Sequence, residues 1–129
     1  MRTIKFRGKI TGDDKWVYGS LVYSKKEDQY YIVEQEGEEL SWEVDKESVG
    51  QSTGLLDKNG KEIFEGDIMG YKYWEDKRDE IKFLDGSFKL VPVQLNNDID
   101  ICRQEVIDRK NLFVIGNRFE NPELLTNNE

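Results

Sequence analysis

Apolar and polar residues alternate along much of the chain, which is typical of strands that bury one face. The alternation is clearest in residues 4–7, 16–23 and 40–44, and a β-branched and aromatic run fills residues 30–33. Shorter apolar runs follow at residues 81–83 and near the end of the chain. Because Gly, Asp and Asn residues separate these runs, we expect short strands joined by tight turns.

Three turn signals stand out between these runs. Asn-Gly at residues 59–60 suits a tight hairpin, because these residue types tolerate positive φ angles, and Asp-Gly at residues 85–86 marks another turn. Glu-Gly-Glu at residues 36–38 predicts another turn. The predicted fold is therefore all-β, with a barrel-like or sandwich architecture of short strands.

Helix signals are few. Residues 100–108 have apolar and acidic positions at helical spacing, but no residue caps the segment well, so we give this helix little weight. Asn121 followed by Pro122 has the order of an N-cap and first helical residue, which predicts a short C-terminal helical turn. The length favours a single domain over residues 1–129, with an ordered core of about residues 2–125.

The amino-acid composition excludes several classes of enzyme and metal site. The chain has 27 acidic and 19 basic residues, a net charge of −8 and no histidine. Without imidazole there is no Ser-His-Asp or Cys-His pair and no histidine metal site. Cys102 alone cannot form an internal disulfide, which fits a reducing compartment. No apolar run approaches the roughly 20 residues that a membrane span requires, so we expect a cytoplasmic protein. Because histidine and the usual catalytic and metal motifs are missing, we expect no catalytic residues, metal or cofactor.

Lys5, Arg7 and Lys9 occupy alternate positions, so on a strand they share one face while Ile4 and Phe6 lie on the other. This face could contact nucleic acid, but the acidic excess of the chain disfavours nonspecific binding to phosphates. We favour a solvated face whose charges discourage pairing between strand edges.

Residues 34–47 hold seven acids and one lysine. Carboxylates spaced along a surface could mimic nucleic acid in the phosphate-binding groove of another protein. A polar hairpin accounts for the same residues more simply, and we favour it.

The segment of residues 57–67 is rich in oxygen ligands, but it does not fit a calcium loop. Loop positions five, six and twelve carry Lys61, Glu62 and Ile68, where an EF-hand requires an oxygen ligand, glycine and an acid. Glu65 and Asp67 leave open a carboxylate-based, metal-dependent hydrolase. The aromatic share of 12% permits base stacking, but we expect most of these rings to lie in the core.

Several blocks of the sequence carry a more specific signal. They are IKFRGK at residues 4–9, WVYGSL at 16–21, VGQSTGL at 49–55, DKNGKEIFEGDI at 57–68, and VIGN at 114–117 with ENPELL at 120–125. In their order and spacing, these blocks closely resemble the YopX protein family. The resemblance implies a small β-rich protein carried by bacteriophages and prophages, expressed in the bacterial host and without an assigned enzymatic activity.

The polar residues of the motif are the remaining candidate binding residues, beside the basic strand. They are Gln51, Thr53, Asp57, Glu65 and Asp67. The alternative is that they form hydrogen bonds with the backbone of turns, and we favour it.

Three functional hypotheses follow. The first is a non-enzymatic accessory protein that binds a host or phage protein, with a homo-oligomer as an open alternative. The second is nucleic-acid association through the basic N-terminal strand and aromatic residues. The third is the carboxylate-based hydrolase.

Overall fold

The chain is almost entirely built of short antiparallel strands. The structure is a computed structural model that describes residues 4–34, 40–94 and 98–126. Its strands are β1 (Phe6–Lys9), β2 (Trp16–Ser24), β3 (Gln29–Val33), β4 (Ser41–Val44), β5 (Gly50–Leu56), β6 (Glu62–Phe64), β7 (Asp67–Tyr71), β8 (Trp74–Leu84), β9 (Ser87–Pro92), β10 (Asp100–Ile101) and β11 (Leu112–Asn117). Its helices are α1 (Gln104–Lys110) and the 3₁₀ turns η1 (Lys46–Ser48) and η2 (Pro122–Leu125). The all-β prediction is confirmed, and η2 is the predicted C-terminal turn.

Contacts divide the chain into two compact units, Met1–Ser52 and Thr53–Glu129. Strand β5 contributes to both, since its first residues pair with β1 and its last residues continue into the β5–β6 hairpin. Within the described residues, neither antiparallel sheet closes into a barrel. No helix in this part of the chain has the length and apolar character that crossing a bilayer requires.

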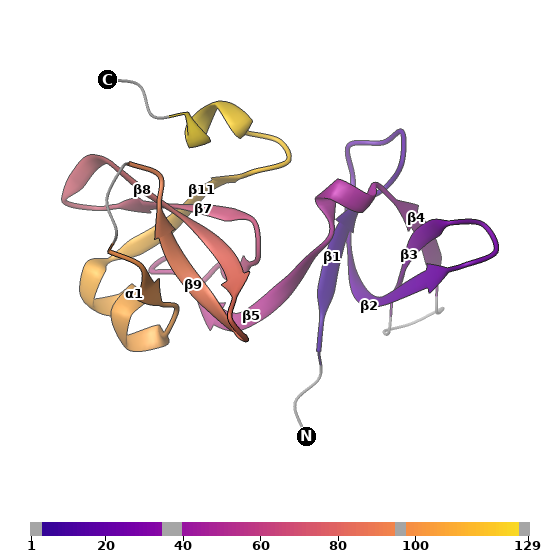
Figure 1. The fold of residues 1–129 in the computed structure, drawn as a ribbon, viewed down its shortest axis with the longest axis horizontal. Helices are drawn as coiled ribbons and strands as arrows, with labels where there is room; N and C mark the ends of the chain where they lie inside the picture. The colour runs from indigo at the N-terminus through magenta and orange to yellow at the C-terminus, as the bar shows by residue number, and fades with distance from the viewer. Residues whose placement is uncertain (1–3, 35–39, 95–97, 127–129) are drawn as a thin grey trace. The chain divides into compact units, whose positions relative to one another are not determined.

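The first unit is a curled sheet in the strand order β4-β3-β2-β1-β5 (Figure 1). Its core is formed by Val17, Ile32 and Val44, with partly buried aromatic and aliphatic side chains around them. Ile10, just after β1, forms an isolated bridge with Val44, so the sheet bends back on itself. Gly19 permits this bend, because a Cβ there would lie 2.1 Å from the carbonyl oxygen of Val33.

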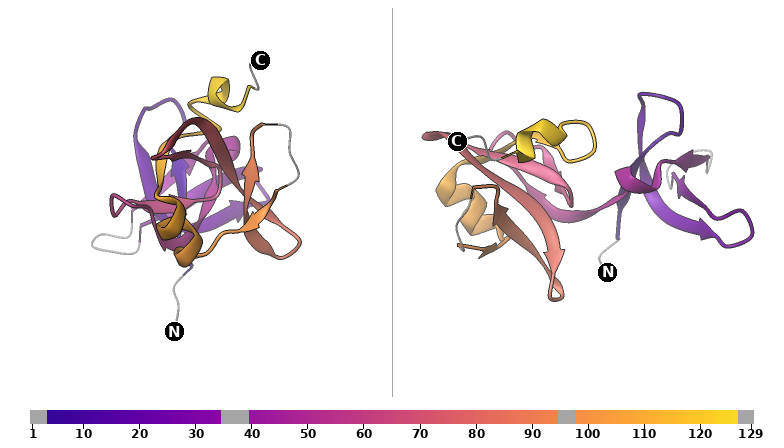
Figure 2. Two further views of the ribbon diagram at one scale, coloured as in Figure 1. Left: turned by 90° about the vertical axis from the view of Figure 1, so that its left-hand side faces the viewer. Right: turned by 45° about the horizontal axis from the view of Figure 1, so that its top comes forward.

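The second unit contains the β5–β6 hairpin and a five-stranded sheet in the order β10-β9-β8-β7-β11 (Figure 1). Helix α1 packs Val106 and Ile107 into a core with side chains from the sheet, including Met69 and Ile81. Strands β8 and β9 form a long twisted hairpin, which Figure 2 shows from two further directions. This unit holds the largest cluster of buried apolar residues in the described chain.

The observed conformations of the turns match the predicted ones at residues 85–86 but only partly at residues 59–60. Asp85 and Gly86 both have positive φ angles, 51° and 84°, as a two-residue hairpin turn requires. In the other predicted hairpin only Gly60 has a positive φ, 81°, and its N–H donates to the carbonyl of Asp57. That turn therefore contains an extra residue before β6. The turn predicted at residues 36–38 lies outside the described residues.

Two elements differ from the sequence expectations. Strand β8 runs through the charged residues 74–80, which lack an alternating apolar pattern, whereas only residues 81–83 were predicted. Helix α1 forms at residues 104–110 without a side-chain N-cap, and it ends at Asn111 in the left-handed conformation, with φ 51°. Burial of Val106 and Ile107 in the core stabilises this helix in the absence of a side-chain N-cap.

Candidate binding site

The basic residues of the N-terminal strand do share one face. The β1–β2 register places Arg7 opposite Tyr18 and Lys9 opposite Trp16. Arg7 is only 7% exposed, and its guanidinium lies 5.0 Å from the centre of the Trp16 ring. The expectation of a fully solvated face is therefore wrong for Arg7, whose aliphatic stem and charge both contribute to packing.

Gln51 and Thr53 lie on β5, close in sequence but in different units. Gln51 is opposite Phe6 in the β1–β5 pair. The Thr53 hydroxyl is buried, donates to the carbonyl of Ile63 at 2.8 Å and accepts the N–H of Leu55 at 3.1 Å. Thr53 thus ties β5 to β6.

Asp57 holds a turn together through both of its carboxylate oxygens. Oδ1 accepts the N–H groups of Asn59 and Lys61, at 2.9 and 2.8 Å. Oδ2 accepts the N–H of Val114, in β11, at 2.9 Å. The side chain is buried, so its oxygens serve the backbone of two segments that are distant in sequence.

Asp67 also binds the backbone of a turn, the one between β6 and β7, where its Oδ2 accepts the N–H of Phe64 at 2.8 Å. Glu65 lies within this turn and is partly exposed. Among the described residues, no three Cys, Asp or Glu side chains gather closely enough to hold a metal ion. Asp57 and Asp67 therefore bind the backbone of turns, which is the alternative that the sequence favoured for them.

A buried polar pair lies between β7 and β8, at positions that the sequence did not single out. The Tyr71 hydroxyl donates to Oδ2 of Asp79, and Oδ1 of Asp79 accepts no hydrogen bond from the described residues. Burial is the main cause that raises the pKa of Asp79 above its usual value, and the hydrogen bond from Tyr71 opposes this rise. Burial also raises the pKa of the Tyr71 phenol, so the hydroxyl remains a donor.

Basic side chains surround this pair. The ammonium groups of Lys77 and Lys110 lie 5.2 and 5.9 Å from the centre of the Tyr71 ring. Lys110 also donates to Asp100 at 2.6 Å, and this bond lowers the pKa of Asp100. These polar and cation–π contacts therefore connect β7, β8, β10 and α1.

The turn between β7 and β8 carries the most exposed large rings of the described chain. Tyr73 is 79% exposed and Trp74 is 62% exposed. The ammonium of Lys72 lies 5.1 Å from the Tyr73 ring, and that of Lys77 lies 5.2 Å from the Trp74 ring. We call these four residues the aromatic tip. Of the nine Trp and Tyr residues only Tyr71 is buried, so the expectation that most of these rings lie in the core is wrong.

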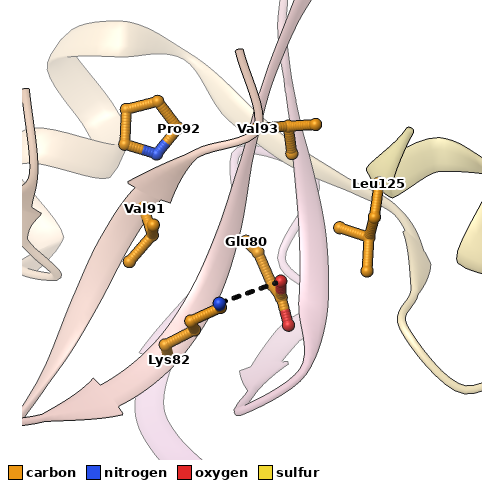
Figure 3. Close-up of a pocket in the computed structure, with 6 residues that line it drawn as sticks. All are labelled: Glu80, Lys82, Val91, Pro92, Val93 and Leu125. Atoms are coloured by element: carbon orange, nitrogen blue, oxygen red, sulfur yellow. Dashed lines mark ion pairs between the residues drawn. The ribbon is translucent and has the colours of Figure 1, made fainter. Parts of the chain in front are cut away.

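A pocket of about 270 Å³ lies on the same unit, between the β8–β9 sheet and η2. It is lined by Glu80, Lys82, Val91, Pro92, Val93 and Leu125 (Figure 3). Glu80 and Lys82 point toward one another, with 3.8 Å between Oε1 and Nζ. On the other side, Oε2 of Glu80 lies 3.6 Å from Nε of Arg118.

Comparison with known proteins gives a family. The model of the family described as "YopX protein" matches residues 5–126. The chain belongs to the YopX family. No functionally curated protein matches this YopX-family chain in sequence.

Two solved structures share the YopX fold seen here. Protein EF1440 from Enterococcus faecalis is 30% identical, with a TM-score of 0.61, over 96% of this chain and 99% of that protein. Protein yopX from Bacillus subtilis is 19% identical, with a TM-score of 0.54, over the full length of both chains. The resemblance inferred from the sequence blocks is therefore confirmed.

Proposed function

We propose that this YopX-family chain is a non-enzymatic accessory protein, encoded by a phage or prophage, that binds a protein partner in the cytoplasm of a bacterium. The observation that carries the proposal is the exposure of Tyr73 and Trp74 at the aromatic tip. Tryptophan and tyrosine are enriched at the centres of protein interfaces, where a few rings account for most of the affinity.

The geometry of the tip supports this use. The Tyr71–Trp74 pair of β7 and β8 closes the turn and places both rings at the end of this hairpin, next to a bulge of β8 at residues 75–77. Lys72 and Lys77 lie over the rings and present charge beside apolar surface. A partner that covers the rings would remove two large apolar groups from water, which is the main favourable term in association.

The contacts of the other candidate residues also support binding of a protein partner. Asp67, one of the two carboxylates of the hydrolase hypothesis, is buried and accepts the N–H of Phe64, which disfavours its contact with a substrate. Arg7 is buried, so a nucleic acid would have to displace it from its packing before contacting its charge. Both features favour the protein partner over the alternatives.

Affinity purification tests the proposal. The tagged chain is recovered from the bacterium that encodes it, after nuclease treatment, in parallel with a Tyr73→Ser/Trp74→Ser variant. Tyr23→Ser, which removes another exposed ring, is the matched control. We expect one protein to be recovered with the parent chain and the control, and about tenfold less with the double variant.

Retention of the same protein by the double variant would contradict the role of the tip. Loss of the partner on nuclease treatment alone would instead favour nucleic-acid association.

A further inference from the structure

The pocket beside η2 has a feature that ordinary surface hollows lack, which is a buried carboxylate without a hydrogen bond. Glu80 is only 6% exposed. Its Oε2 atom is buried and accepts no hydrogen bond from the described residues. Its Oε1 atom faces Lys82 at 3.8 Å, which is too long for a hydrogen bond. A carboxylate removed from water in this way favours any donor that can reach it.

The two resident cations balance the charge of Glu80 without satisfying its oxygens. The side chains of Lys82 and Arg118 are 42% and 59% exposed, and both keep distances beyond hydrogen-bond length. Exposed long side chains of this kind are held weakly. Lys82 can therefore leave the mouth of the pocket when a better donor arrives.

The rest of the lining is apolar. Val91, Pro92, Val93 and Leu125 surround the carboxylate on the two sides of the pocket (Figure 3). Once Lys82 has left, an acceptor with apolar side chains beside it matches a side chain with an aliphatic stem and a cationic head. The volume of about 270 Å³ suits a single side chain, because pockets for small molecules begin at roughly 300 Å³.

We propose that the Glu80 pocket receives an arginine side chain of the partner protein, whose guanidinium donates to the carboxylate of Glu80 while its stem packs on Val91, Val93 and Leu125. This inference rests on the proposed function and specifies the partner as a protein with an exposed arginine. Arginine is favoured over lysine because its planar fork is pre-organised for a carboxylate and is more weakly hydrated. The net charge of −8 also attracts a basic partner surface.

A model ligand tests the pocket without any need to know the partner. Nuclear magnetic resonance follows the backbone N–H signals of the full chain during titration with N-acetyl-arginine N-methylamide. The matched probe is the corresponding citrulline derivative, which has nearly the same shape but no charge. We expect saturable shifts confined to Val91, Val93 and Leu125 with the arginine probe, and binding at least about tenfold weaker with the citrulline probe.

Two variants give opposite predictions. Glu80→Gln keeps the volume and should weaken the arginine probe about tenfold, whereas Glu75→Gln, an exposed acid on the same strand, should leave it unchanged. Lys82→Met removes the competing cation and should strengthen the arginine probe about threefold. Since Lys82 is partly exposed, this second variant keeps the fold and remains informative if Glu80→Gln does not fold.

Each of three results with the arginine probe would overturn the inference. These are the absence of localised shifts, equal binding of the two probes, or weaker arginine binding in Lys82→Met. Preferential binding of N-acetyl-glutamate N-methylamide would also overturn it, because the site would then serve anions. Failure here leaves partner capture by the aromatic tip unaffected, and failure of partner capture leaves the affinity for arginine measured, so the two proposals fail separately.

Discussion

A single carboxylate, that of Asp57, joins two segments of the second unit that are far apart in sequence. It accepts N–H groups from its own turn and from Val114 in β11. Removing it would leave three backbone donors without their acceptor, and buried donors of this kind are costly. The geometry of this turn and its link to β11 therefore depend on one side chain.

We expect Asp57→Ala to lower the free energy of unfolding by about 3 kcal/mol, because hydrogen bonds to a charged group each contribute about 1.5–3 kcal/mol but are not additive. Urea denaturation followed by circular dichroism measures the change. Asp76→Ala, at an exposed position, should change stability by less than about 0.5 kcal/mol. A loss below about 1 kcal/mol for Asp57→Ala would contradict the role of this carboxylate.

At the scale of single residues, sequence reasoning is strongest where one residue decides the local backbone. Asp85-Gly86 was predicted as a turn from its residue types, and both residues have the positive φ that these types tolerate. The bonds of Asp57 to its own turn follow from the same local chemistry. Its bond to Val114 does not, because it depends on how β11 is placed in three dimensions.

At the scale of elements, the curl of the first sheet depends on close backbone approach at Gly19. A Cβ at this position would lie 2.1 Å from the carbonyl oxygen of Val33, so the β2 and β3 backbones would have to separate. We expect Gly19→Ala to lower the free energy of unfolding by about 2 kcal/mol, in the range of other overpacking changes. Thermal unfolding of this variant beside Lys26→Ala, in an exposed turn, checks the expectation. Equal stability of the two variants would show that the sheet absorbs the methyl group without strain.

The Tyr71–Asp79 pair makes stability depend on pH. Because the pKa of Asp79 is raised in the folded state, its contribution is fully present below about pH 4 and is lost as the pH rises through the folded pKa. Asp100 acts in the opposite direction, since its pKa is lowered and its contribution is lost as the pH falls.

We expect Asp79→Asn, which keeps an oxygen acceptor for Tyr71, to gain stability relative to the parent chain as the pH rises from 4 to 7. Urea denaturation of both proteins at several pH values measures this difference, and the contribution of Asp100 cancels because both proteins contain it. A difference that stays constant, or that shrinks with rising pH, would contradict burial as the cause of the shift.

The elements that the sequence missed are those whose stability comes from neighbours. The charged residues 74–80 resemble a loop when read alone, yet β7 pairs with Trp74 and with residues 78–80, and β9 pairs with Asp79 and Glu80. The contact between Tyr71 and Asp79 depends on the register of β7 and β8, including its shift after Gly70. The exposure of Trp74 likewise follows from its place beside the turn, which composition could not reveal.

In the whole molecule, the net negative charge and the exposed rings act at different stages of binding. A net charge of −8 favours encounter with a basic surface, while the rings of Tyr73 and Trp74 offer the apolar area that holds a complex together. Trp74 and Glu80 of β8 lie opposite Tyr71 and Ile68, which are three residues apart on β7, so they are separated by roughly 10 Å along the sheet. An interface of standard size, about 800 Å² on each partner, can cover both places.

Site-directed photocrosslinking at position 74 tests whether the aromatic tip contacts a protein partner. A benzophenone amino acid replaces Trp74 in the full chain, and the same residue at position 26, an exposed turn, is the control. After irradiation of bacterial cells that encode the chain, we predict one covalent adduct with a different protein at position 74 and none at position 26. The claim would be contradicted by the absence of an adduct at position 74, by the same adduct at both positions, or by an adduct that contains only two copies of this chain.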